Sequence, residues 1–289
     1  SRWANGWKAT SEGRRRLTRV AFDFPRDLLS SHCLEMAVIP GDELVVRSDF
    51  TVRTFARDMS SGGSFEMPNG PGDIAASEQF FYTTGPDHEV CRHTHDGTVV
   101  ASYGNQDTPQ VYAPVLAPGG LLFGVLGDDD DSGKDEIIAL DAQTLQYRYR
   151  FGLSLLSGAC GLVVIGEELF VCDSDNDRVQ VFSLAGEHRR SITGEWERPV
   201  ALCFMKDRLY LVEEDNDEKD EEGELVNPLS GRRICVLSLQ GDTLEVYQNP
   251  VEGSTFSDTL CCFDGKLLAP VQGGASGRVY VGVVALRDL

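Results

Sequence analysis

Short runs of apolar residues separated by turn residues recur along this chain, always in the same order. The clearest copy has apolar or alternating stretches at 160–165, 168–172, 178–183 and 187–193. Glycine, aspartate and other polar residues separate them. Runs of this length that are rich in β-branched and aromatic residues and bounded by turn residues are typical of β-strands. The stretch therefore predicts four consecutive antiparallel strands.

The four-strand plan occurs six times. The first apolar residue of the second strand marks each copy, and successive markers are 36 to 58 residues apart: Leu44, Phe80, Leu121, Leu169, Leu209 and Leu267. A four-stranded unit at this spacing is the signature of a β-propeller blade. The gaps between strands are too short for the crossover helices of an α/β fold. We predict an all-β, six-bladed propeller that forms a single domain over residues 1–289, with blades at about 34–70, 72–110, 113–157, 158–198, 199–256 and 258–289.

The sixth copy has only three strands in the sequence that follows the fifth. A spare strand pattern lies at the other end of the chain, at Leu17–Phe24. A blade left incomplete would expose the hydrogen-bonding edge of its sheet. We therefore expect the N-terminal strand (16–24) to complete the last blade by pairing with Arg278–Leu286.

The loop after the second strand of the fourth copy carries a more specific pattern. Residues 169–192 read LFVCDSDNDRVQVFSLAGEHRRSI. This resembles an NHL repeat, in which Asp, Asn and Arg-Val precede a strand and a glycine turn. The resemblance implies a six-bladed propeller, a binding platform as its usual role, and Asp173, Asn176 and Arg178 as residues that tie the loop. An EF-hand calcium loop is not favoured, because Arg178 stands where that loop needs glycine.

Composition narrows the classes of partner. The chain has 46 acidic and 26 basic side chains and a net charge of -20. Nucleic-acid binding depends on Lys and Arg contacts with phosphates, so no nucleic-acid partner is expected. No apolar run approaches the roughly 20 residues that span a bilayer, so membrane insertion is not expected. The eight cysteines form no C-x-x-C motif and lie mostly in apolar strands, which favours reduced thiols and an intracellular, by default cytoplasmic, protein.

Acidic residues concentrate in three loops that join the second and third strands of copies three to five. Equivalent loops project from one face of a propeller, and a negative face attracts basic peptides and divalent cations. Such charge runs are also common as merely solvated surface. We predict a non-catalytic scaffold, part of a larger protein or assembly, that binds a basic protein partner. The predicted binding residues are Asp128, Asp129, Asp130, Asp131, Asp173, Asp175, Asp177, Glu213, Glu214, Asp215 and Asp217.

A second hypothesis is a calcium-dependent hydrolase of lactonase type. Propellers of that class hold the metal in the central channel, with Glu, Asn and Asp side chains at the entrances of the first strands. In this chain those positions carry Glu35, Asn69, Asp73 and Asp258. No G-x-S-x-G motif or glycine-rich phosphate loop points to another catalytic group. The sequence therefore predicts no catalytic residue, and no cofactor unless calcium occupies this channel.

Overall fold

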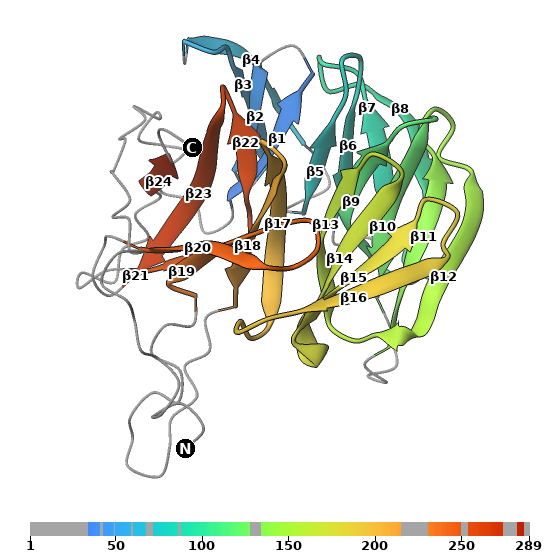
Figure 1. The fold of residues 1–289 in the computed structure, drawn as a ribbon. Helices are drawn as coiled ribbons and strands as arrows, with labels where there is room; N and C mark the ends of the chain where they lie inside the picture. Colours follow the sequence, from blue (N-terminus) through green and yellow to red (C-terminus); the bar gives the residue numbers. More distant parts are fainter. Residues whose placement is uncertain are drawn as a thin grey trace.

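The computed structural model describes residues 34–40, 43–48, 50–58, 60–67, 72–85, 88–127, 134–214, 231–249, 254–273 and 282–285. These residues form six antiparallel sheets arranged around a common centre (Figure 1). The predicted all-β, six-bladed propeller is therefore confirmed. No helix in these ranges is long and apolar enough to cross a membrane.

In the first five blades the strands pair in chain order, from the centre outward. The bounds in blades one to three are β1 Leu34–Ile39, β2 Glu43–Ser48, β3 Thr51–Phe55, β4 Ser61–Glu66, β5 Ile74–Ala76, β6 Phe81–Thr84, β7 Val90–His93, β8 Val99–Tyr103, β9 Val111–Ala117, β10 Leu121–Leu126, β11 Asp135–Asp141 and β12 Tyr147–Leu156. Blades four and five contain β13 Ala159–Ile165, β14 Glu168–Asp173, the single-turn 3₁₀-helix η3 Ser174–Asn176, β15 Arg178–Ser183, β16 His188–Thr193, β17 Pro199–Met205, β18 Arg208–Glu213, β19 Arg233–Leu237 and β20 Thr243–Gln248.

The sixth blade has an interrupted inner strand. β21 (Ser254–Phe256) and β22 (Cys261–Phe263) both pair with β23 (Lys266–Gly273), and β24 (Gly282–Ala285) pairs with the other edge of β23. The sequence predicted that the fifth blade ends at residue 256, whereas this pairing places β21 in the sixth blade. The predicted closing strand Leu17–Phe24 lies outside the described residues, so its pairing stays a prediction.

The inner strands form a closed ring. β1 contacts β5, β5 contacts β9, β9 contacts β13, β13 contacts β17, β17 contacts β22, and β22 contacts β1. A side-chain hydrogen bond also joins the last blade to the first, because Thr259 Oγ1 donates to Glu35 Oε2 at 2.7 Å. The first and last blades therefore meet at the centre of the molecule.

The second strand of a blade is buried on both faces, which explains its continuous apolar sequence. In β14, Leu169 and Val171 pack against blade three, whereas Phe170 and Cys172 pack against blade five. All four side chains are fully buried. The outer strand β16 alternates instead, with Ile192 buried and its neighbours exposed. A blade therefore buries its two apolar faces against the two adjacent blades. This is typical of repeat proteins, in which a single repeat does not fold alone.

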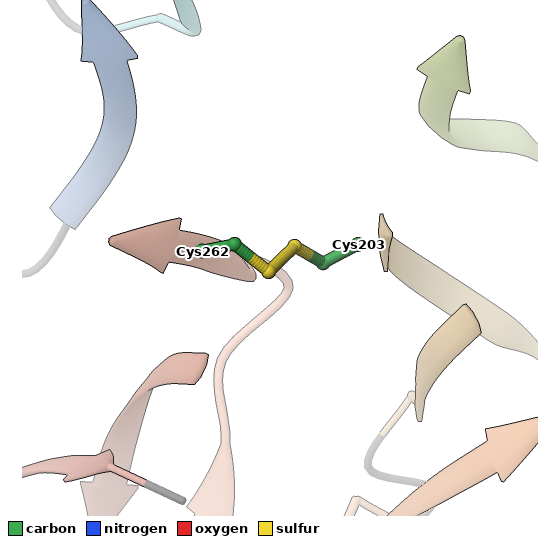
Figure 2. The surroundings of a disulfide bond; sticks show 2 residues. All are labelled: Cys203 and Cys262. Atoms are coloured by element: carbon green, nitrogen blue, oxygen red, sulfur yellow. A yellow bond between two sulfur atoms is a disulfide. The ribbon is translucent and has the colours of Figure 1, made fainter. Parts of the chain in front are cut away.

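A disulfide joins two adjacent inner strands. Cys203 of β17 and Cys262 of β22 are bonded, with 6.7 Å between their Cα atoms and a sequence separation of 59 (Figure 2). The expectation of reduced thiols was wrong for this pair, because the packing of blade six against blade five brings two cysteines together that are far apart in the sequence. Among the other described cysteines, the thiols of Cys160, Cys172, Cys235 and Cys261 are free.

A buried ion pair in blade five should make a large contribution to the free energy of unfolding. The Arg233 guanidinium donates to both carboxylate oxygens of Glu213, and these side chains are 3% and 0% exposed. Replacing Arg233 by Ala leaves Glu213 buried without its cation, so we expect a loss of about 3–5 kcal/mol in the free energy of unfolding. Urea denaturation would measure this loss.

The control is Arg208→Ala, which breaks the partly exposed pair between Arg208 and Glu245. That change should cost no more than about 1 kcal/mol. Equal losses in the two variants would contradict a structural role for the buried pair.

Candidate functional site

A cavity of about 330 Å³ lies at the centre of the ring, where the inner strands begin. All six blades contribute to it. The lining residues are Glu35, Met36, Asp73, Ile74, Tyr112, Ala113, Pro114, Cys160, Gly161, Leu162, Val200, Ala201, Leu202, Asp258, Thr259 and Leu260. Its volume is at the lower end of the range of small-molecule pockets, which is roughly 300–1,000 Å³.

The cavity lies at the same face as the connections between second and third strands. In four blades, a backbone N–H at the end of the second strand donates to the carbonyl of a residue just before the inner strand. The pairs are Thr84 to Asp73, Gly127 to Gln110, Asp175 to Ser157 and Glu214 to Arg198. We call this side of the propeller the channel face. The sequence-predicted channel residues and acidic loops therefore belong to one face.

Three predicted carboxylates, which we call the channel carboxylates, line this one cavity: Glu35, Asp73 and Asp258. They come from blades one, two and six. Glu35 accepts the hydrogen bond from Thr259, and Asp73 Oδ2 accepts one from the backbone N–H of Ala113 at 2.5 Å. Ser257 Oγ donates to Asp258 Oδ1 at 2.9 Å. The fourth predicted member, Asn69, lies outside the described residues.

Burial and mutual repulsion shift the protonation of this cluster. Burial raises the pKa of Glu35 well above its usual value, and the charges of Asp73 and Asp258 raise it further. Burial also raises the pKa of Asp73, although its hydrogen bond from Ala113 opposes the shift. Proximity of like charges and loss of solvent both disfavour ionised carboxylates. A positive charge entering the cavity would therefore be stabilised here.

One arginine already lies close to the cluster. Arg47 of β2 is 2% exposed, and its Nη1 lies 3.5 Å from the carbonyl oxygens of Asp73 and Thr84. Its charge lowers the pKa of both Glu35 and Asp73 and so partly offsets their burial. The channel carboxylates still outnumber this arginine by three to one.

The calcium hypothesis requires several oxygen ligands around one point, because calcium takes about six to eight of them at 2.3–2.6 Å. Within the described ranges, no three His, Cys, Asp or Glu side chains form a group that could hold a metal ion. Glu35, Asp73 and Asp258 instead each have a hydrogen-bond donor within the protein.

Two residues predicted for the acidic face have a structural role instead. Asp173 and Glu213 end β14 and β18 and are 0% and 1% exposed. Asp173 accepts hydrogen bonds from Arg178 Nε at 2.6 Å and Asn176 Nδ2 at 2.8 Å, so the predicted loop ties are confirmed. Glu213 is paired with Arg233. Because both side chains are buried and paired with an arginine of the same blade, neither is exposed for contact with a partner.

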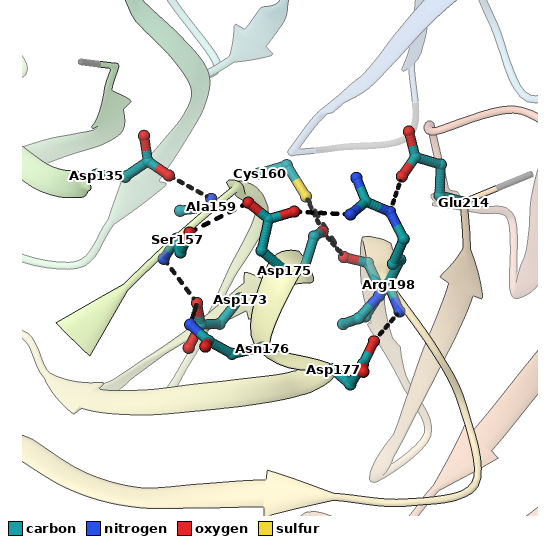
Figure 3. Close-up of polar contacts among 12 residues, drawn as sticks. Asp135, Ser157, Ala159, Cys160, Asp173, Asp175, Asn176, Asp177, Arg198 and Glu214 are labelled. Carbon is teal, nitrogen blue, oxygen red and sulfur yellow. Dashed lines mark hydrogen bonds and ion pairs between the residues drawn. The ribbon is translucent and has the colours of Figure 1, made fainter. Parts of the chain in front are cut away.

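The remaining described carboxylates of the predicted face surround Arg198 (Figure 3). Its guanidinium contacts Asp175 at 2.7 Å and Glu214, and its backbone N–H donates to Asp177 Oδ1 at 2.8 Å. Asp175 and Glu214 are 41% and 45% exposed, so these contacts lie at the surface. The group links blades four and five and keeps a net negative charge at the channel face. Asp128, Asp129, Asp130, Asp131, Asp215 and Asp217 lie outside the described residues.

Sequence reasoning missed all three arginines that define this face: Arg47, Arg198 and Arg233. Arg178 follows Asp173 by five positions and was found from the NHL-like spacing, whereas Arg233 follows its partner Glu213 by 20. The acidic insertion between β18 and β19 separates Glu213 from Arg233 in the sequence, so that Arg233 is not easily recognised as the equivalent of Arg178. Arg198 acts between blades, so no spacing within a repeat could indicate it. Arg233 could have been identified by aligning the starts of the third strands of blades four and five, because both begin with an arginine.

Comparison with known proteins supports the fold and goes no further. No family model matches this sequence, and no curated protein is similar to it. BamB from Moraxella catarrhalis is similar in structure, with a TM-score of 0.52 and 14% identity over 86% of this chain and 83% of that one. A calcium-binding protein, regucalcin, from Agrobacterium tumefaciens strain C58 has a TM-score of 0.64 and 10% identity over 89% and 87%. The NHL resemblance therefore stays a prediction, whereas the propeller fold is shown.

The raised pKa of Glu35 predicts how stability depends on pH. The folded protein holds this proton more tightly than the unfolded chain, whose glutamate pKa is about 4.3. The free energy of unfolding therefore falls as the pH rises from that value through the folded-state pKa. Glu35→Gln removes the ionisation, so it should raise the Tm at alkaline pH and lose this advantage near pH 4. Thermal melts across pH would measure the difference.

The matched control is Glu43→Gln, which changes an exposed residue at the start of β2. It should leave the pH profile unaltered. A Glu35→Gln profile parallel to that of the unmodified protein would mean that Glu35 does not titrate as the cavity geometry requires.

Proposed function

We propose that this propeller is a non-catalytic binding module for a basic segment of a protein partner. The channel carboxylates would anchor a lysine or arginine side chain of that segment in the central cavity. One observation carries the proposal: Glu35, Asp73 and Asp258 come from three blades yet line one cavity at the channel face.

Electrostatics supports a cationic ligand. Burial and repulsion from neighbouring carboxylates disfavour the charges of Glu35 and Asp73, and an entering ammonium or guanidinium would relieve that cost. The cavity is large enough for the head of one long side chain but small for a folded element. The overall charge of -20 would also steer a basic partner toward the protein.

The acidic sequence segments would extend this site. Gly127 and Glu214, which flank two of them, bond to the residues that begin the neighbouring inner strands. Asp175, Asp177 and Glu214 all contact Arg198 and add carboxylates to the channel face around the cavity. The buried pairs at Asp173 and Glu213 are not part of the proposed surface.

Binding of labelled decalysine, followed by fluorescence polarisation, would test this function. The affinity should fall steeply with salt, because the contacts are mainly electrostatic. The Glu35→Gln/Asp258→Asn double variant should bind at least about tenfold more weakly, equivalent to about 1.4 kcal/mol. Acetylated decalysine, which lacks the side-chain charges, is the peptide control.

The matched protein control is Glu78→Gln/Glu167→Gln. These exposed residues lie in the turns β5–β6 and β13–β14, at the opposite ends of the inner strands, and the charge change is the same. Its affinity should stay within about twofold of that of the unmodified protein. Equal binding by the channel variant and this control would show that the basic segment docks elsewhere.

The calcium-dependent hydrolase is the second candidate function. The placement of three predicted metal residues in one cavity favours it, whereas the lack of a described three-ligand group does not. Calcium binding to the folded state would raise the Tm as its concentration increases. We expect calcium to produce no such rise. A rise that disappears in Asp258→Asn would establish the metal site and refute the scaffold.

A further inference from the structure

Two free thiols lie on neighbouring strands, and one of them lines the central cavity. Cys160 is on β13 and Cys172 is on the neighbouring strand β14. Ala159 pairs with Asp173 and Leu162 with Val171, so Cys160 and Gly161 together face Cys172 at an irregularity of the ladder. Opposed residues on antiparallel strands have Cα atoms about 4.5–5.5 Å apart, within the range that a disulfide spans.

Their exposure differs. Cys160 is partly exposed and lines the cavity, whereas Cys172 is 0% exposed and packs between blades four and five. A reagent that enters the cavity therefore meets Cys160 first.

Polar atoms surround the Cys160 thiol (Figure 3). Its Sγ lies 3.1 Å from Ser174 Oγ, and its S–H donates to the carbonyl oxygen of Pro199 at 3.4 Å. The neighbouring Cys172 thiol is the main cause that lowers the pKa of Cys160, although burial and the charge of Asp258 oppose the shift. Burial raises the pKa of Cys172 well above its usual value. Thiolates are the nucleophiles of thiol–disulfide exchange, so the pair has one attacking and one resolving member.

We propose that Cys160 reacts with small disulfides that enter the central cavity and that Cys172 resolves the product. In the first step the Cys160 thiolate attacks a sulfur of the disulfide RSSR, forming Cys160–S–S–R and releasing RS⁻. In the second, Cys172 loses its proton and attacks the Cys160 sulfur, releasing the second RSH. The protein pair is oxidised to a Cys160–Cys172 disulfide, and RSSR is reduced to two thiols.

The cavity also determines which disulfides react. Glu35, Asp73 and Asp258 line the same cavity as Cys160. Their negative charge concentrates a cationic reagent there and repels an anionic one. We therefore expect cystamine, which carries two ammonium groups, to react faster than neutral 2-hydroxyethyl disulfide. Oxidised glutathione, which is anionic, should be the slowest. This chemistry goes beyond the proposed partner binding and does not require it.

Three other described cysteines provide internal controls. Cys91, Cys235 and Cys261 are 3%, 4% and 5% exposed. Burial raises the pKa of both Cys235 and Cys261 to about 12. None of the three lines the central cavity. They should stay unmodified while Cys160 reacts.

The test follows modification by peptide mapping and mass spectrometry in a Cys33→Ser background, because Cys33 lies outside the described residues. Cystamine should produce the Cys160–Cys172 disulfide, with the loss of two hydrogens, about tenfold or more faster than oxidised glutathione does. Cys172→Ser should trap the mixed disulfide on Cys160, and Cys160→Ser should abolish both products. Asp258→Asn should reduce the rate ratio of cystamine to 2-hydroxyethyl disulfide.

Two results would overturn the inference. The first is modification of Cys160 no faster than that of Cys91, Cys235 and Cys261. The second is a mixed disulfide on Cys160 that persists in the protein with Cys172 intact. Equal rates for all three reagents would refute the charge selection by the cavity. Because none of these readouts uses a basic peptide, failure here and failure of the proposed function are distinguishable.

Discussion

Buried carboxylates at the blade junctions are the interaction on which the rest of this structure depends. The chain must cross from the outer strand of one blade to the inner strand of the next. At such a crossing the backbone is not yet hydrogen-bonded within the next sheet. Four acidic side chains accept backbone N–H groups at these crossings: Asp73 from Ala113, Asp135 from Ala159, Asp173 from Ser157 and Glu213 from Glu197. Unsatisfied backbone donors at such buried positions would cost about 1–3 kcal/mol each.

This constraint divides the acidic residues of the channel face into two groups. Asp173 and Glu213 are paired with Arg178 and Arg233, so their charge serves the junctions and is unavailable to a ligand. Glu35 and Asp258 lie in the cavity, where Arg47 is the only described arginine whose charge lowers the pKa of Glu35. Asp73 belongs to both groups, since it binds the junction at Ala113 and lines the cavity. The same residue type therefore stabilises the ring at its junctions and leaves unbalanced negative charge at its centre.

The sequence predicted the features that repeat within a blade. Strands expected at 160–165, 168–172, 178–183 and 187–193 are observed within one residue of those bounds, because period-two alternation and turn residues are local signals. The ties of Asp173 to Asn176 and Arg178 were likewise local. The convergence of Glu35, Asp73 and Asp258 followed from equivalent positions in different blades. Two contacts between consecutive blades had no local signal, namely Arg198 with Asp175 and Cys203 with Cys262. Within blade five, the pair of Glu213 with Arg233 spans a long insertion and had none either. Packing of whole blades and strands, rather than a short sequence pattern, brings these residues together.

The location of a bound basic side chain tests the central claim most directly. A crystal structure of the protein with a short lysine peptide would show where its ammonium groups lie. Our account predicts one ammonium in the central cavity, within hydrogen-bonding distance of Glu35, Asp73 or Asp258. A peptide bound only around Arg198, or on the opposite face of the propeller, with the cavity holding none of it, would contradict the claim.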